Sequence, residues 1–439
     1  DALRSQPSLQ AMNSFPTIFS SSSSRSMRLR RVRNKRLIDI IMVKERPALF
    51  YTLALVIGVL LYAKWPFFAG FLDLLTIAVV TVLVAAAICL LVYRIGRRNA
   101  FMIIGMLCAG MICSVALCAA HDNIKDIGGE SEWKTNISRG AAAVRQDVTD
   151  LYIANGLEAD ELAVVSAMTL GDKRFIDRSL RNEYSRAGVA HVLALSGTHL
   201  AILYFVLMLI VGWSRVGRFV VIATIWCYVV IVGMPVSAVR AAIMLSIFTL
   251  TEVLKPGSDR LDVLVTTIMI MVLVNPRIIL DVGFQLSIMS VGAIIVICPL
   301  LNGLLPPEFH SHHHYLSKIW GMVSVGLAAQ LGTAPLVAFY FHSLPCWFII
   351  SNLIVVPLTT LLLYGALAIV MFWPLSFIQL WLVKAVGLIA WVMNGTVEYI
   401  SQLPLAAIDG IRLSVLQVII CYILIAVLLK IIDYLQIKI

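Results

Sequence analysis

CWFIISNLIVVPLTTLLLYGALAIVMFW, residues 346–373, is longer than the roughly 20 residues that an α-helix needs to cross a lipid bilayer, and it contains no charged residue. The rest of the chain has a similar character. Of its 439 residues, 60% are hydrophobic and 13% are charged, and the mean hydropathy is +0.94. A soluble globular chain carries about 25% charged residues. The composition therefore excludes a multi-domain soluble protein and predicts an integral membrane protein.

The spacing of the apolar stretches predicts an all-α polytopic membrane protein with about twelve transmembrane helices. We expect these helices at 48–63, 66–92, 100–120, 190–212, 218–234, 236–254, 261–276, 279–300, 319–340, 346–373, 377–397 and 413–434. The chain then divides into a disordered basic leader (1–46), N-terminal transmembrane helices (47–120), an extracytoplasmic helical segment (121–189) and a second transmembrane domain (190–439).

The net charge of +10 is distributed unevenly along the chain. Basic residues cluster at 25–46, before the first apolar stretch, and they recur in the loops that twelve spans place on the same side as the N-terminus. Cytoplasmic loops of membrane proteins are rich in Lys and Arg, so both termini are expected to be cytoplasmic. Attraction to anionic membrane lipids also explains the N-terminal cluster. We favour this interpretation over a nucleic-acid-binding arm.

Residues 121–189 interrupt the apolar pattern. They include twelve acidic and nine basic residues, a net charge of minus three, and the predicted topology places them outside the cell membrane. Helical spacing of apolar residues at 136–153 and 158–187 predicts short amphipathic helices packed on the membrane surface. With this net charge, the segment as a whole is not expected to attract DNA.

No cofactor or metal site is predicted. The eight cysteines lie in apolar segments without paired C-x-x-C spacing, which is typical of small packing residues. Four histidines between 310 and 314 resemble metal ligands, but the only acidic residue beside them is Glu308. We interpret this stretch as a solvated loop.

Polar residues inside predicted spans indicate function, because burying them in lipid costs free energy unless they find partners or water. The densest group is HVLALSGTH, residues 191–199, at the start of the predicted span 190–212. Ser196 and His199 are three residues apart and would share a helix face, with Gly197 allowing another backbone to approach closely. The hydroxyl groups could simply join helices, whereas His191 and His199 together favour a position beside an aqueous path.

Two further sets of polar residues lie next to predicted turns between spans. Arg240 lies near the outer start of its span, where it could reach the interface or attract phosphate in a pathway. Asp281 and Gln285 are one helical turn apart at the start of the predicted span 279–300. Asp281 could cap that helix and also pair with Arg240.

The stretch near the C-terminus is expected to contain broken helices. Gln330, Gly332 and Pro335 would interrupt one span, His342 would lie in an outer corner, and Asn352 would enter the next span together with Pro357. Broken helices in membrane proteins usually line water or are buried in protein.

Four short motifs together resemble the competence domain of the ComEC family. They are HVLALSGTH at 191–199, VRAAIM at 239–244, NP at 275–276 followed by DVGFQLS at 281–287, and YFHS at 340–343 followed by NLIVVP at 352–357. Their order and spacing also match, over about residues 160–400. The resemblance implies a multi-pass channel in the bacterial inner membrane that passes one strand of transforming DNA into the cytoplasm.

A strand of DNA is a polyanion and needs a polar or basic lumen to cross a membrane. On the family's pattern, the residues expected to line or brace that lumen are His191, Ser196, Gly197, His199, Arg240, Asp281, Gln285, His342 and Asn352. The implied partners are single-stranded DNA, an outer DNA receptor, a cytoplasmic motor or helicase, and membrane lipids.

The chain also departs from larger members of that family. These resemble a three-part design with an outer oligonucleotide-binding β-domain and a metallo-β-lactamase-like nuclease domain, and the sequence contains neither pattern. A separate nuclease would then degrade the other strand, and no catalytic residue is predicted. Two alternatives stay open: an intramembrane enzyme for a lipid-linked substrate with His191 or His199 as general base, and a transporter of a small anion.

Overall fold

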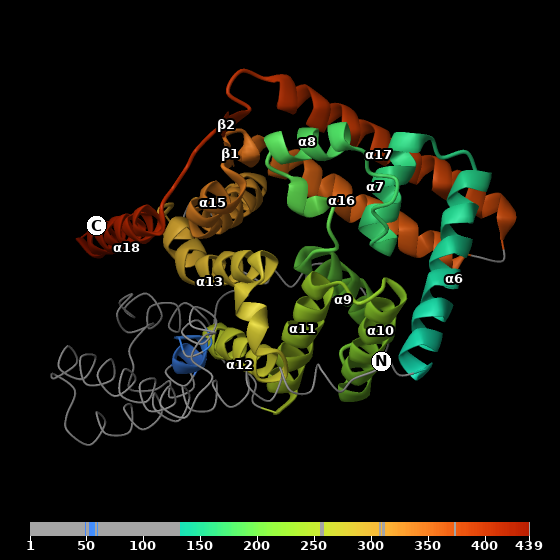
Figure 1. Ribbon diagram of the computed structural model, residues 1–439, viewed down its shortest axis with the longest axis horizontal. Helices are drawn as coiled ribbons and strands as arrows, with labels where there is room; N and C mark the ends of the chain where they lie inside the picture. Colours follow the sequence, from blue (N-terminus) through green and yellow to red (C-terminus); the bar gives the residue numbers. More distant parts are fainter. Residues whose placement is uncertain are drawn as a thin grey trace, which may run out of the picture.

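The computed structural model describes residues 49, 52–57, 59 and 132–438, except for 255–258, 307–308, 310–311 and 373–374. The predicted leader, most of the span 48–63, and the spans 66–92 and 100–120 therefore lie outside the described residues. Helices make up nearly all of the described chain, as the composition predicts (Figure 1).

The helices form three groups that meet near the middle of the molecule. The first contains α9 (Gly197–Val211), α10 (Arg215–Ile231), α11 (Val236–Leu254) and α12 (Arg260–Val274). The second contains α13 (Val282–Asn302), α15 (His314–Phe341) and α18 (Val415–Lys438). The third contains α16 (Phe348–Met371) and α17 (Ser376–Gln402), with α7 (Ala159–Leu170) and α8 (Arg178–Arg186) packed on them. Helix α6 (Glu132–Ala154) packs against α10 and α7.

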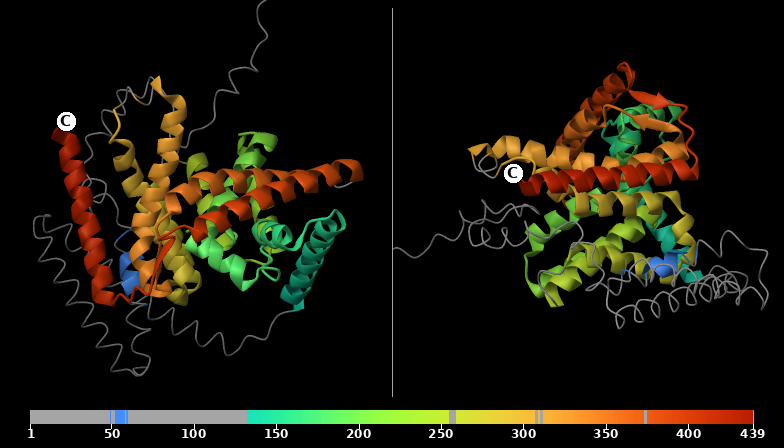
Figure 2. Two further views of the ribbon diagram at one scale, coloured as in Figure 1. Left: turned by 90° about the horizontal axis from the view of Figure 1, so that it is seen from above. Right: turned by 90° about the vertical axis from the view of Figure 1, so that its left-hand side faces the viewer.

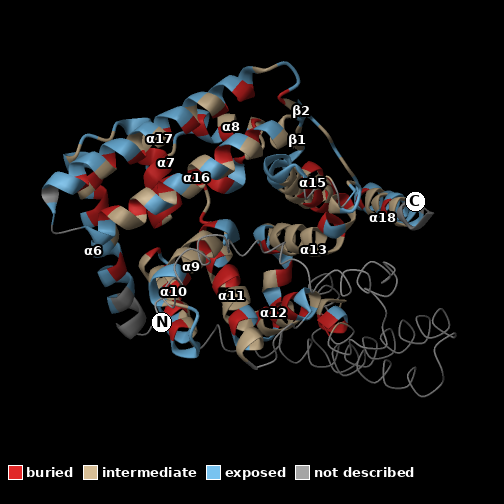
Figure 3. Cartoon of the chain, turned by 180° about the vertical axis from the view of Figure 1, so that it is seen from behind, coloured by how far each residue is buried: buried red, intermediate tan, exposed pale blue. Residues whose placement is uncertain are grey.

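Six described helices are long and apolar enough to cross a membrane: α11, α13, α15, α16, α17 and α18. The chain is therefore a multi-pass membrane protein, while the number twelve stays a prediction. Most of α18 is exposed (Figure 3), and many of its exposed residues are large and apolar, which suits contact with lipid. The helices of the different groups run in different directions. In particular, α16 and α17 run across α15 and α18 (Figure 2).

The described part of the segment 121–189 is helical, as the sequence indicates, but one of its helices is not amphipathic. Every residue of α7 from Leu162 to Leu170 is buried, against α16 and α17. The expectation of a surface helix here is wrong, because Ala163, Val164 and Ala167 make the other faces of this helix apolar as well. This buried helix connects α6 to the third group, whereas α8 packs directly on α17.

The expected breaks in the later spans are also not found. Helix α15 continues through Pro335 and α16 continues through Pro357. Gly332 has a packing role instead: a Cβ atom there would lie 2.4 Å from the Cβ atom of Ala293 and 2.7 Å from the carbonyl oxygen of Met289. The absent side chain therefore lets α13 and α15 approach closely.

A two-stranded antiparallel ribbon is the element that the all-α prediction missed. Strands β1 (Ser343–Pro345) and β2 (Ala407–Asp409) pair directly after α15 and α17. His342 ends α15 in the left-handed conformation, with φ of 56°, and so turns the chain into β1. Three-residue strands are too short to give a visible alternating pattern in the sequence.

We expect Gly332→Ala to lower the free energy of unfolding by about 1–3 kcal/mol, because the added methyl group forces α13 and α15 apart. Gly326→Ala, in the same helix, is the matched control: nothing lies within 4 Å of its Cβ position, so better helix propensity should stabilise it by up to about 1 kcal/mol. Unfolding experiments on the detergent-purified variants measure both changes in the free energy of unfolding. Equal stability of the two variants would contradict this packing role.

Candidate functional site

Residues 190–199 form a connector between the third helix group and the first. Residues Ala190–Val192 make one 3-10 turn, a bend follows, and α9 begins at Gly197. The expected span 190–212 therefore starts too early. Gly188 explains the close fit at the start of this connector, because it has φ of +80° and a Cβ atom there would lie 2.9 Å from Phe348 and Pro345.

Ser196 and His199 form a local helix cap. The backbone N–H of Ser196 donates a hydrogen bond to Nδ1 of His199 over 3.2 Å, and the Ser196 hydroxyl donates to Oγ1 of Thr198 over 3.0 Å. The two residues thus close the first turn of α9, and do not form the helix-to-helix contact that shared-face spacing suggests. The spacing in the sequence alone did not distinguish this capping role from a contact between helices.

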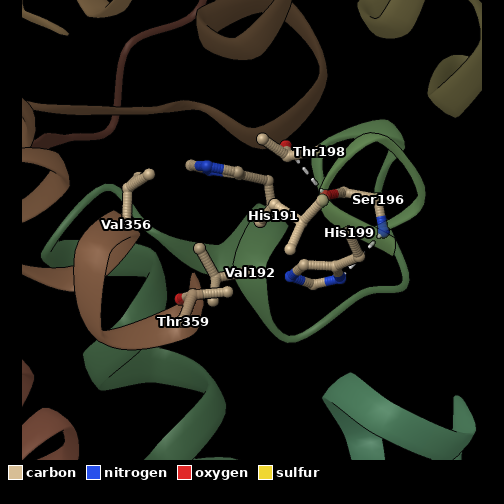
Figure 4. A pocket seen from close by; sticks show the side chains of 8 residues that line it. His191, Val192, Ser196, Thr198, His199, Val356 and Thr359 are labelled. Atoms are coloured by element: carbon tan, nitrogen blue, oxygen red, sulfur yellow. Dashed lines mark hydrogen bonds between the residues drawn. The ribbon is translucent and has the colours of Figure 1, made fainter. Parts of the chain in front are cut away.

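This cap fixes how the His199 ring presents its second nitrogen. His199 is 3% exposed, and its Nδ1 accepts a hydrogen bond from a backbone N–H, which can only donate. In the neutral ring the proton is therefore on Nε2. That nitrogen faces a small cavity (Figure 4), and no described residue accepts its hydrogen bond. The cap thus directs one N–H group of a buried ring toward the cavity, and that group bonds to none of the described residues.

The cavity lies between the connector, α9 and α16. Its volume is about 20 Å³, enough for roughly one water molecule. Polar and apolar side chains line it together: His191, Val192, Ser196, Thr198, His199, Ile202, Val356 and Thr359. The structure therefore brings His191, Ser196 and His199 together, as predicted from the connector sequence, around a space far smaller than a nucleotide.

Gly197 and Asn352 lie at the edges of this group. A Cβ atom on Gly197 would make an ordinary contact of 3.6 Å with Ala241, so the expected close backbone approach is not found there. Asn352 is half-buried in α16, one helical turn before Val356. By this spacing it shares the helix face that reaches the cavity.

Arg240 and Asp281 brace the first helix group against the second. Arg240, in α11, is 6% exposed, and its Nη2 donates to the carbonyl oxygen of Gly283 over 2.9 Å. Its Nη1 lies 3.5 Å from Oδ1 of Asp281. The same carboxylate oxygen accepts the N–H of Phe284 over 2.7 Å and so caps α13. Asp281 therefore both caps and pairs, and the guanidinium of Arg240 is committed to α13.

Gln285 and His342 continue this brace toward the ribbon. Gln285 donates to the carbonyl oxygen of Ile279 over 2.9 Å and accepts from the hydroxyl group of Tyr340 over 2.8 Å, which joins α13 to α15. His342 is exposed, and its Nδ1 lies 3.0 Å from the carbonyl oxygen of Ile411. Neither side chain lines the cavity.

The sequence interpretation missed several residues around the site. Val356 and Thr359 line the cavity together with Thr198, which belongs to the predicted polar group, and Ser237 fixes the connector by donating to the carbonyl oxygen of Leu195 over 2.6 Å. Asn352 and Thr359 are seven residues apart in an apolar span, so helical spacing of polar residues was the signal for this wall. No group of three or more metal-ligating side chains occurs in the described part of the chain.

We expect Arg240→Met to lower the free energy of unfolding by about 2 kcal/mol, because it removes charge-assisted hydrogen bonds between α11 and α13. Asp281→Asn keeps the helix cap and tests the charge, since Asn caps as well as Asp. The double variant should lose about 0.5–1 kcal/mol less than the sum of the two single losses. Unfolding experiments in detergent measure the free energy of unfolding of all three variants. If the loss in the double variant equals the sum of the two single losses, Arg240 and Asp281 are not coupled.

Comparison with known proteins identifies the family of the chain. The family model described as competence protein matches residues 168–433 of the 439, which is more than half of the chain and includes the connector, the cavity and the brace. No solved structure matches the chain.

Two curated relatives also match. ComE operon protein 3 of Bacillus subtilis (strain 168) is 27% identical over 225 residues, which are 50% of this chain and 28% of the relative. The uncharacterized protein YcaI of Escherichia coli (strain K12) is 24% identical over 339 residues, 66% of this chain and 43% of the relative. The chain spans less than half the length of these relatives. Because the family model covers most of it, the chain belongs to the competence protein family.

Proposed function

We propose that this chain is the inner-membrane channel through which one strand of transforming DNA enters the bacterial cytoplasm. Membership of the competence protein family supports a role in DNA uptake. In this proposal the strand arrives from an outer DNA receptor, a cytoplasmic motor or helicase pulls it inward, and a separate nuclease degrades its complement. Both termini lie in the cytoplasm.

The observation that carries the proposal is the polar cavity between the connector and α16. His199 presents an N–H group there that bonds to none of the described residues. Thr359 lies in the opposite wall, where its hydroxyl group donates to the carbonyl oxygen of Val355 over 2.8 Å. A polar group in a membrane domain is costly unless it finds a protein partner, water or a ligand. The position of the His199 N–H group at the junction of two helix groups supports a transport path that is closed in this structure.

Opening of this path requires the connector and α16 to separate. The cavity of about 20 Å³ holds roughly one water molecule, so a DNA strand passes only after these elements move. Helix α16 packs most extensively on α17, and the connector is attached to α11 through Ser237. We therefore propose that α16 and α17 move together against the first helix group, while the brace at Arg240 stays intact.

Two features disfavour the alternative of an intramembrane enzyme with a histidine base. Such a base needs a carboxylate or metal beside it, and Asp281 was the best candidate from another helix. Asp281 instead caps α13 and pairs with Arg240, and no carboxylate lines the cavity among the described residues. We keep the proposal of a channel without a catalytic residue.

We expect Val356→Phe to reduce uptake of labelled transforming DNA at least tenfold in a transformable bacterium whose own family member is deleted. The added ring would fill the cavity and keep the path shut. Val370→Phe, in the same helix but 52% exposed on the apolar surface, should leave uptake unchanged. Membrane amounts of both variants are measured in parallel. If both variants are present in the membrane in equal amounts and take up DNA equally well, the proposed path is wrong.

A second variant tests the polar group itself. His199→Ala removes the N–H group that faces the cavity together with the cap on Ser196, whereas His199→Asn keeps a side-chain acceptor for the Ser196 N–H. We expect His199→Ala to transport DNA more slowly than His199→Asn, and both to transport it more slowly than the unchanged chain. Full uptake by His199→Ala would remove this residue from the transport mechanism.

A further inference from the structure

Helix α8 separates its apolar and basic residues onto opposite faces. Leu180 and Tyr184 are buried against the third helix group, and the Tyr184 hydroxyl donates to Oδ1 of Asn394 over 2.7 Å. Burial raises the pKa of Tyr184, so its hydroxyl group stays a donor. Arg178 and Arg181 are exposed away from this buried side, whereas Arg186 is half-buried and its Nε atom is buried. The helix thus carries three arginines on a fixed support, and two of them are exposed.

The acidic residues near this face are already occupied. Asp177 caps α8 by accepting the N–H of Leu180 over 2.7 Å, and Glu183 accepts the Ser179 hydroxyl over 3.0 Å. Residues 171–189 contain five basic and three acidic residues, although residues 121–189 carry a net charge of minus three. The basic charge is therefore concentrated at α8 and the loop before it, a separation that the net charge of the whole segment conceals.

An exposed aromatic ring lies beside this basic face. Phe175, in the loop before α8, is 38% exposed, and the Arg174 guanidinium is 5.6 Å from its ring centroid. Arg174 is itself fixed by a 2.6 Å ion pair with Asp172, which holds the pKa of that carboxyl below its usual value. Proteins that bind single-stranded nucleic acid combine basic grooves with aromatic side chains on which bases stack.

The placement of α8 favours nucleic acid over a lipid surface as the ligand. A helix that lies in a membrane interface needs an apolar face directed toward the acyl chains. The apolar residues of α8 instead contact the protein, through Leu180 and Tyr184, and its other face is polar. Without an apolar face toward lipid, the arginines are available to phosphate groups in solution.

We propose that Lys173, Phe175, Arg178, Arg181 and Arg186, here named the α8 platform, bind single-stranded DNA before it enters the channel. The inference rests on the proposed function and adds a DNA-binding surface to it. The position of the platform fits this role, because α8 ends at Arg186 and the connector begins at Ala190 (Figure 1). A strand held by its phosphates on α8 lies next to the segment that leads to His191.

The test measures binding of a fluorescent oligo(dT) to the full chain in nanodiscs of zwitterionic lipid, at several salt concentrations. Each phosphate contact to single-stranded DNA contributes about 0.7 to the slope of log affinity against log salt. Replacing Arg178, Arg181 and Arg186 with Gln should therefore lower the slope by about 2. Replacing all three with Lys should keep it, because the charge remains.

A matched control removes the same charge elsewhere. Gln in place of Arg215, Arg218 and Lys430, which lie on α10 and α18, should leave the slope unchanged. An equal fall in slope for this control would overturn the proposal, since binding would then follow net charge alone. Phe175→Ala should weaken binding at least about fivefold without changing the slope, as expected for loss of base stacking.

The remaining outcomes separate this inference from the proposed function. If the Gln variant of the platform keeps its salt slope while His199→Ala loses DNA uptake, the platform is wrong and the channel stands. If the platform binds oligo(dT) as expected while Val356→Phe and His199→Ala take up DNA normally, the proposed channel function is wrong and the proposed DNA-binding surface stands. If the Gln variant loses binding only to anionic lipid vesicles, the surface is a lipid contact and the inference fails.

Discussion

The buried guanidinium of Arg240 fixes α11 against α13. A charged group with 6% exposure needs partners, and Gly283 and Asp281 at the start of α13 supply them for its two Nη atoms. Its Nε atom is buried without a partner among the described residues. Ser237, one turn earlier on α11, holds the connector through the carbonyl oxygen of Leu195. The position of the cavity therefore depends on a polar contact outside it.

This arrangement joins three helices firmly on one side of the cavity. Helices α11, α13 and α15 are joined by the brace, by Gln285 with Tyr340, and by the close approach at Gly332. Across the cavity, α16 belongs to a different group with α17, α7 and α8. In the proposed function a path opens between these two parts. The proposed α8 platform lies on the part that contains α16, so a strand bound there would move with it.

The sequence predicted the helical fold and the residues of the connector, because apolar composition and polar residues inside apolar spans are strong local signals. The sequence-based predictions were wrong where packing between helices determines the structure. The spacing of Leu162, Val165 and Met168 suggested a surface helix, yet α7 is buried on all sides. Gly332 and Pro335 suggested a broken helix, yet α15 is continuous and Gly332 serves a close helix contact. The pairing of Asp281 with Arg240 was one of the alternatives that the sequence offered, whereas the second partner of Arg240, the carbonyl oxygen of Gly283, could not be read from the sequence.

The most direct test of the central claim is site-specific photo-crosslinking of DNA during uptake. A photoreactive amino acid replaces Val356, which faces the cavity, or Val370, which lies on the exposed apolar surface of the same helix. The bacterium is then illuminated while labelled DNA is entering. The account predicts that the labelled strand is attached to the chain from position 356 and not from position 370. Attachment at neither position, or equally at both, during active uptake would contradict it.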